Sequence, residues 1–411
     1  MNLRACSLLL GGLAVGAAAL LLPARATAAP ASAPPASAAS ATAPPATAAP
    51  ATPAQPAAAC GANGLVLVGS EGGQLHRLRL DTCSGALTPL GEPLALARPR
   101  WITPHPTLPV VYVASDAEGH EGRVAAYALD ADGAALAALG SVGSGGAGAT
   151  HLAVVPGARG LLVANFGAGS ASSLALLADG RLGERTATLQ ATGSGPHRRQ
   201  ASAHAHGVTP DPSGRWALVA DLGADRLFVH AIEPASQRLL ADEVQPPRHL
   251  ALAPGSGPRR TLFGADGRSV YLVNELSGQL QVLRWHADSA RLSPLQTLPL
   301  ASPGFSGTPS GSELLLARDG RTLYAGHRGE NQLLAWRIDP ASGQLSLLQR
   351  LPLAGQGPWA ADLHPSGRWL LTANLRSHQV QVFAVDAASG SLREAGPPLP
   401  LPGAMSLSAV R

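Results

Sequence analysis

The chain repeats one pattern of short apolar strands, and this repetition limits its possible folds more than any other feature. Each copy contains an apolar strand, a tight turn, a second apolar strand, a short polar loop and a third strand. Residues 203–230 show it most clearly (AHAHGVTPDPSGRWALVADLGADRLFVH). The second strands of the copies read LVLVGS, VYVAS, LLVAN, ALVAD, YLVNE, LYAGH and LLTAN. A period of roughly 50 residues filled only with short strands is typical of a β-propeller.

The two ends of the repeated region predict how the ring closes. The first copy begins at Gly64 and lacks the strand that should precede it, whereas residues 405–411 form a terminal strand with no hairpin after it. The terminal strand would complete the first blade and remove both free sheet edges. We therefore expect an all-β, seven-bladed β-propeller over residues 60–411, closed by the C-terminal strand. In the fifth copy we expect the first strand to begin at Arg248 and residues 255–267 to be an inserted loop.

The first 59 residues are expected to lie outside the propeller. Residues 1–29 combine Arg4, an apolar run and small residues at 24–29, which is the arrangement of a secretory signal peptide. The run of about 15 residues is shorter than the roughly 20 of a membrane-spanning helix. No membrane span is therefore expected after cleavage, with an uncleaved anchor as the alternative. Residues 30–59 are almost entirely Ala, Pro, Ser and Thr and predict a disordered linker. The predicted location is periplasmic or secreted.

Composition excludes several classes of function. All 30 basic residues are arginines, so neither a Schiff-base lysine nor a P-loop is possible. No G-x-S-x-G nucleophile motif is present. The arginines are scattered without a basic, aromatic-rich run, so we expect no nucleic-acid partner. Nothing in these residues requires a cofactor, and we expect a monomer.

Two cysteines remain once the predicted signal peptide is removed, Cys60 and Cys83. A single pair in an exported protein predicts a disulfide, here between the start of the fold and its first hairpin turn. Two unrelated thiols are the alternative. A zinc site is disfavoured because no further cysteine is available.

The repeats predict that one rim of the central channel carries residues that differ from copy to copy. In an antiparallel pair, the start of the first strand and the end of the second lie at the same face. The opposite face receives stereotyped turns such as PSGR, RDGR and ADGR, whereas the rim positions differ between copies. We therefore place the functional site at the rim. The expected ends of the second strands are Ser70, Ser115, Asn165, Asp221, Glu275, His327 and Asn374.

Five rim residues carry side chains suited to catalysis or metal binding. His204 and His206 point to the same side of a strand, where they could bind a metal or pair a base with a positioning group. Glu275 is a candidate general base. Arg248 and Arg328 offer planar cations for a carboxylate, a phosphate or a developing oxyanion. Purely structural pairing is the alternative for each. The expected substrate-binding residues are Asn165, His206, Asp221, Glu313 and His327.

The motifs also carry a family resemblance. Residues 203–230, together with NFGAGS before them and PRHLAL, VNEL and HRGENQL after them, resemble the seven-bladed propeller lactonase family. That family contains the propeller-type 6-phosphogluconolactonases and is similar to the carboxy-muconate lactonising enzyme. The resemblance covers essentially residues 61–411. It implies hydrolysis of a small sugar-type lactone at the channel mouth.

In the lactonising relatives, a histidine, a glutamate and two arginines are proposed to act on the lactone ring. Matching the family's PHAH, PRH, NEL and NRG motifs onto this sequence implies these roles for His204, Arg248, Glu275 and Arg328. The chain departs from the family at Ala203, where the family has Pro, and at His327, where it usually has Asn.

In the mechanism that the resemblance implies, Glu275 or His204 activates a water while Arg248 and Arg328 polarise the ester carbonyl and hold the acidic end of the substrate. Two alternatives stay open. One is a non-catalytic propeller that binds a ligand or a protein at the same rim. The other is a metal-dependent lactonase, with a metal held by His204, His206, Asp221 and Glu275.

Overall fold

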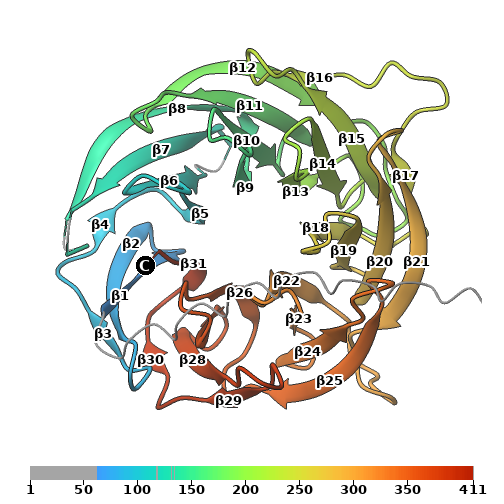
Figure 1. Ribbon diagram of the computed structural model, residues 1–411. Coiled ribbons are helices and arrows are strands. Elements are labelled where there is room, and N and C mark those ends of the chain that lie inside the picture. Colours follow the sequence, from blue (N-terminus) through green and yellow to red (C-terminus); the bar gives the residue numbers. More distant parts are fainter. Residues whose placement is uncertain (1–62, 117–118, 131, 134, 411) are drawn as a thin grey trace, which may run out of the picture. The chain divides into compact units, whose positions relative to one another are not determined.

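The computed structural model describes residues 63–116, 119–130, 132–133 and 135–410, which form seven antiparallel sheets arranged in a ring (Figure 1). Within these ranges every regular element is a strand, so the predicted all-β propeller is confirmed. The expected signal peptide, the linker and Cys60 lie outside the described residues. In the part of the chain that the structure covers, no helical segment has the length and apolarity of a membrane span.

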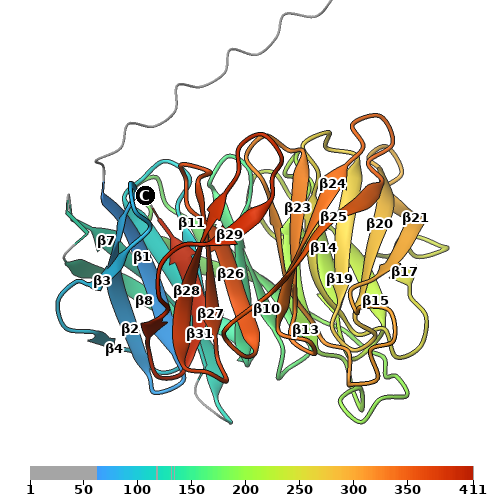
Figure 2. The same ribbon diagram turned by 90° about the horizontal axis from the view of Figure 1, so that it is seen from below.

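Each sheet is one blade, and its strands run from one face of the ring to the other (Figure 2). Blade 1 holds β1 (Asn63–Ser70), β2 (Gln74–Asp81), β3 (Leu87–Pro89), β4 (Leu94–Ala95) and β31 (Ala404–Ala409). Blade 2 holds β5 (Pro99–Pro104), β6 (Val110–Ser115), β7 (Glu121–Leu129) and β8 (Leu136–Ala147). Blade 3 holds β9 (Ala149–Val154), β10 (Gly160–Asn165), β11 (Ser170–Leu176) and β12 (Leu182–Gln190).

The remaining blades follow the same order. Blade 4 holds β13 (Ala205–Pro210), β14 (Trp216–Asp221), β15 (Arg226–Ile232), β16 (Leu239–Leu240) and β17 (Leu250–Ala251). Blade 5 holds β18 (Pro258–Phe263), β19 (Ser269–Asn274), β20 (Gln279–His286) and β21 (Arg291–Pro299). Blade 6 holds β22 (Gly311–Leu316), β23 (Thr322–His327), β24 (Gln332–Ile338) and β25 (Leu345–Pro352). Blade 7 holds β26 (Pro358–Leu363), β27 (Trp369–Asn374), β28 (Gln379–Val385), β29 (Leu392–Glu394) and β30 (Leu399–Pro400).

The ring closes in blade 1, where the C-terminal strand β31 pairs antiparallel with β1. The register joins Val66 to Ala409 and Ser70 to Ala404. Leu407 of β31 is buried in one core cluster with Val66 and Trp369, so the closure also joins blades 1 and 7 through apolar packing. This confirms the predicted closure: β1 is paired on both sides, by β2 and β31, and β31 becomes the innermost strand of blade 1.

The second strands hold neighbouring blades together. Strands β6, β19 and β23, for example, are buried along their whole length, because they lie inside their own sheet and between adjacent blades. Tyrosine hydroxyls in these strands donate to a turn carbonyl of the next blade: Tyr112 to Gly180 at 2.8 Å, Tyr271 to Gly343 at 3.1 Å and Tyr324 to Gly390 at 2.8 Å. A buried hydroxyl needs such a partner, so the contact fixes the packing of one blade on the next.

The predicted start of blade 5 is wrong. Its innermost strand is β18, which pairs with β19, so the residues expected to be an inserted loop contain this strand. The segment after Arg248 instead forms β17, which pairs with β15 at the outside of blade 4. The turn at residues 265–267 explains the difference. It occupies the place that PSG at 212–214 holds in blade 4, so the strand directly before it must be the innermost one.

Each innermost strand carries a β-bulge at the end that faces the last residue of the second strand. In blade 5, Pro258 pairs with Asn274 and Arg260 with Val273, which leaves Arg259 outside the ladder. A bulge bends its strand and redirects the side chain of the extra residue. The bulge residues are Arg100, Thr150, His206, Arg259, the pair Ser312 and Glu313, Trp359 and Met405.

Candidate active site

Glu275 lies at the centre of a buried group of arginines at the bulged end of the channel. Glu275 is only 3% exposed. Oε2 lies 2.8 Å from Nη2 of Arg328 and 3.2 Å from Nε of Arg259. Oε1 lies 2.5 Å from Nη1 of Arg199, which comes from the loop between β12 and β13. One carboxylate therefore faces three guanidinium groups.

The backbone brings Glu275 and Arg328 to the channel in the same way. Each directly follows the last residue of a second strand, and its N–H donates at 2.7 Å to a carbonyl just before the innermost strand, that of Gly257 or Ser310. The same bond recurs in every blade, so we call these places the post-strand positions. They are occupied by Glu71, Asp116, Phe166, Leu222, Glu275, Arg328 and Leu375.

His206, the bulge residue of β13, completes the group. Its Nε2 lies 3.5 Å from Oε2 of Glu275, and the ring of Phe166 meets its imidazole edge-on at 5.3 Å. Burial lowers the pKa of His206 to about 3, and the nearby charge of Arg259 acts in the same direction against the pull of Glu275. The imidazole is therefore neutral. With the Nε2 proton directed at Glu275, the buried Nδ1 has no hydrogen-bond partner among the described residues and is left as an acceptor.

A second carboxylate, that of Glu313, lies on the innermost strand of blade 6, the blade after the one that carries Glu275. Glu313 of β22 places Oε2 3.2 Å from Nη1 of Arg259 and Oε1 3.2 Å from Nε of Arg260. Arg260 in turn lies over the ring of Trp101, 4.3 Å from its centroid. Burial lowers the pKa of Arg260 to about 9, partly offset by Glu313, so its guanidinium remains charged at neutral pH.

We call the group formed by these residues the arginine cluster: Arg199, His206, Arg259, Arg260, Glu275, Glu313 and Arg328. Its four guanidinium groups outnumber its two carboxylates, so the cluster attracts negative charge. Burial acts to raise the pKa of Glu275, but Arg328, His206 and Arg259 hold it well below its usual value. Glu275 is therefore an ionised group that orders the cations, and it is a weak proton acceptor.

The family model described as "Lactonase, 7-bladed beta-propeller" matches residues 65–409. The chain belongs to this family. The 6-phosphogluconolactonase of Bacillus subtilis is 26% identical to it over 324 residues, which are 79% of this chain and 90% of the relative.

Solved structures of the lactonase family superpose on almost their whole length. The periplasmic gluconolactonase of Pseudomonas aeruginosa has a TM-score of 0.79 and 33% identity, covering 85% of this chain and 99% of that one. A putative 6-phosphogluconolactonase of Bacteroides fragilis has a TM-score of 0.76 and 26% identity, covering 85% and 98%.

Four of the site residues expected from the sequence lie in the arginine cluster of this lactonase-family propeller. They are His206, Glu275, Glu313 and Arg328. Glu275 was expected to end the second strand, but that position is held by Asn274, and Glu275 lies one residue further at the post-strand position. Their chemical roles stay predictions.

Arg248 does not lie at the start of an innermost strand, where we expected it. Its Nη1 donates to Oδ1 of Asp242 at 2.5 Å, its backbone N–H donates to Oδ2 at 2.6 Å, and its guanidinium lies 5.0 Å from the centroid of the Trp216 ring. The innermost strand begins ten residues later, and Arg259 occupies the place expected for Arg248. The catalytic role that the PRH match at 247–249 implies for Arg248 stays a prediction.

His204 and Asp221 support the loop rather than the cluster. The ring of His204 stacks on Phe166 with centroids 4.7 Å apart, and its Nδ1 lies 2.9 Å from the carbonyl oxygen of the same residue. Oδ1 of Asp221 accepts the backbone N–H groups of His204 and Ala224, both at 2.8 Å. Across the described ranges, no three residues of the His, Cys, Asp and Glu types are placed to hold a metal ion.

Asn165 and His327 are also occupied by backbone groups. Nδ2 of Asn165 donates to the carbonyl of Ser144 at 3.1 Å. Nε2 of His327 accepts the N–H of Ser310 at 3.2 Å, and its Nδ1 lies 3.3 Å from Glu330. Both side chains are fully buried at the ends of second strands, and their expected substrate contacts stay predictions.

Three cluster residues were missed from the sequence, namely Arg199, Arg259 and Arg260. For Arg259 a signal existed, because the Pro-Arg pair at 258–259 repeats the pair at 99–100. Arg100 indeed sits on the equivalent bulge and pairs at 3.1 Å with Asp116, its own post-strand residue. Arg199 comes from a loop without a repeated pattern, so no sequence signal marks it.

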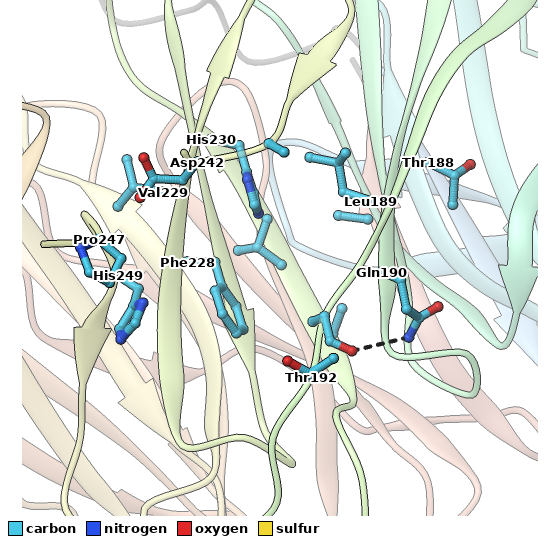
Figure 3. A pocket seen from close by; sticks show the side chains of 15 residues that line it. Thr188, Leu189, Gln190, Thr192, Phe228, Val229, His230, Asp242, Pro247 and His249 are labelled. Atoms are coloured by element: carbon cyan, nitrogen blue, oxygen red, sulfur yellow. Dashed lines mark hydrogen bonds between the residues drawn. The ribbon is translucent and has the colours of Figure 1, made fainter. Parts of the chain in front are cut away.

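A separate cavity of about 410 Å³ lies between blades 3 and 4 (Figure 3). Its wall includes Gln190 and Leu189 of β12 and Phe228 of β15. Asp242, which pairs with Arg248, and Pro247, which directly precedes Arg248, also line it. Of the residues that line this cavity, none belongs to the arginine cluster.

Proposed function

We propose that this protein hydrolyses a small sugar-type lactone at the bulged end of its channel. The arginine cluster is the observation that carries the proposal, because it combines a neutral histidine, two carboxylates and an excess of guanidinium groups in one buried site. Family membership and the names of the relatives, 6-phosphogluconolactonase and gluconolactonase, support it.

Lactone hydrolysis develops negative charge twice, first on the carbonyl oxygen during attack by water and then on the carboxylate product. Arg259 and Arg328 can donate to that oxygen, and pre-oriented donors of this kind stabilise the transition state. Arg199, whose side chain is 40% exposed, can bind an acidic end of the substrate at the mouth of the site. Glu275 keeps all three guanidinium groups oriented.

His206 is the residue best placed to accept the proton of the attacking water. In the empty site its pKa is low because of burial and the charge of Arg259. A substrate that brings negative charge among the guanidinium groups raises this pKa, so Nδ1 becomes a better acceptor as charge develops. The ring C–O bond then breaks, the proton held by His206 passes to the leaving ring oxygen, and the lactone becomes a hydroxy acid.

We further propose that the chain is exported, as a periplasmic or secreted protein, on the strength of the signal-peptide pattern and the periplasmic relative. The proposed disulfide would join Cys60 to Cys83, which is exposed in the turn after β2. Mass spectrometry of the exported protein, with and without reduction, tests both proposals.

The test of function is acid release by the purified full chain from a panel of sugar lactones, phosphorylated and not, with the spontaneous rate subtracted. Turnover by the wild type, and its loss in a folded Glu275→Gln variant, is the expected result. If no lactone is turned over, the function is overturned. Calorimetric binding of a lactone or its acid would then favour the non-catalytic binding propeller.

A further inference from the structure

Two consecutive arginines share one carboxylate in the arginine cluster. Arg259 and Arg260 are 2% and 4% exposed, and both lie 3.2 Å from Glu313, one at each carboxylate oxygen. Neighbouring residues on a regular strand point to opposite faces. The bulge between Pro258 and Arg260 breaks this alternation, so both guanidinium groups reach the same partner.

Each of the two guanidinium groups has a second nitrogen that contacts a different part of the site. Nε of Arg259 lies 3.2 Å from Oε2 of Glu275. Nη1 of Arg260 donates to the carbonyl of His206 at 2.5 Å. Nε2 of His206 itself faces Glu275, so the contacts form a closed loop. In order, the loop runs through Glu275, Arg259, Glu313, Arg260 and His206 and back to Glu275.

Gly207 shows that this approach is tightly packed. A Cβ at this position would lie 2.6 Å from the carbonyl oxygen of Arg259 and 3.2 Å from Nη1 of Arg260. The first distance is shorter than any ordinary Cβ contact, so only glycine after His206 lets β13 and β18 come this close.

We propose that Glu313 is a positioning residue for lactone hydrolysis, which holds Arg259 and Arg260 side by side so that Glu275 and His206 keep their mutual geometry. This rests on the proposed function. Two buried guanidinium groups on adjacent residues repel each other, and the shared carboxylate offsets that repulsion through two charge-assisted contacts. Without it, Arg259 moves away from Glu275 and Arg260 releases the backbone of His206.

The variant Glu313→Gln tests the proposal, because it keeps the shape and removes the charge. We expect kcat to fall about 10- to 100-fold with KM changed much less, since a small misplacement of catalytic groups acts mainly on the chemical step. Asp362→Asn is the matched control. Asp362 is a half-buried carboxylate on the innermost strand β26, and its hydrogen-bond partners are the Ser408 hydroxyl and the N–H groups of Ala409 and Leu363. This control should keep kcat within about twofold.

A double substitution separates positioning from a general effect on folding. Arg260→Gln removes the cation that Glu313→Gln leaves unbalanced, so the double variant should recover part of the lost kcat. A merely structural role predicts that the two losses add or worsen. If Glu313→Gln does not fold, Glu313→Asp keeps the charge but shortens the reach, and it should lower kcat in a folded protein.

Two outcomes overturn the proposal while the wild type still hydrolyses lactones. One is unchanged kcat in folded Glu313→Gln or Glu313→Asp. The other is a double variant with no recovery. Absence of turnover in the wild type instead contradicts the proposed function itself, so the two failures are distinguishable.

Discussion

Nη2 of Arg328 lies 2.8 Å from Oε2 of Glu275, and the two residues occupy the same post-strand position in adjacent blades. The same backbone hydrogen bond places both side chains at the channel, where they form an ion pair between neighbouring blades. Charge at this position is not a property of the fold, because Phe166, Leu222 and Leu375 hold the equivalent places elsewhere.

Arg199 and Arg248 offer a direct comparison of an arginine inside the cluster with one outside it. We expect Arg199→Gln to lower kcat/KM for an acidic lactone about 10- to 100-fold, because one charged donor near Glu275 is lost. Arg248→Gln should stay near wild type, since Arg248 pairs with Asp242. Steady-state kinetics on both purified variants decides. Equal losses would return Arg248 to the site.

The buried His206 makes stability depend on pH. Its pKa is about 3 in the folded protein, mainly through burial, against 6.5 for the free side chain. Between these values the unfolded chain binds more protons, so the free energy of unfolding should fall as pH drops from 6.5 towards 3. Urea denaturation at pH 7 and pH 4.5 should show a smaller loss for His206→Gln than for wild type. An equal loss of stability between the two pH values in wild type and variant would contradict the low pKa of His206.

Asp362 should act in the opposite direction. Burial raises its pKa to about 6 from 3.8, so the folded state binds more protons between those values. Its contribution to stability therefore declines as pH rises from 3.8 to 6. Relative to wild type, Asp362→Asn should gain about 1–3 kcal/mol between pH 4 and pH 7, the size expected for such a shift. Denaturation curves at the two pH values measure the free energies of unfolding of both proteins. If the variant differs from wild type by the same amount at both pH values, the raised pKa of Asp362 is contradicted.

Ring closure can be tested at Leu407 of β31, which is 4% exposed. Leu407→Ala should lower the free energy of unfolding by about 2–5 kcal/mol, because it opens a cavity where blades 1 and 7 meet. The control is Leu347→Ala on β25, where the leucine is 45% exposed. That control should change stability by less than about 0.5 kcal/mol. Similar melting temperatures for both variants would contradict a closing role for β31.

The ring could be predicted from the sequence because the repeats are local. Each second strand is an apolar run. The first copy, at Gly64, lacks one strand, and the terminal strand at Met405 supplies it. Blade 5 was misread because its connection is longer than the others, so PRH at 247–249 resembled a strand start. The ADG turn at 265–267 was the better guide to the register.

The site was harder to predict than the fold. The second strand ends at Asn274, and Glu275, one residue later, is the side chain that contacts the guanidinium groups, so an error of one residue changes the expected role. The sequence pattern alone also does not reveal the bulge that redirects Arg259. Arg199 reaches Glu275 from a non-repeated loop across 76 residues of sequence, a contact that only the folded ring creates.

The bulges have a consequence for how such a chain can change over evolutionary time. A bulge residue is outside the hydrogen-bond ladder of its sheet, so exchanging its side chain breaks no contact that pairs the strands. Arg259, Trp359 and Met405 already show how different the occupants can be. New substrate preference can therefore arise by exchange of bulge residues on an unaltered frame. Where two bulge residues contact each other, as Arg259 and Glu313 do, a change at one alters the surroundings of the other.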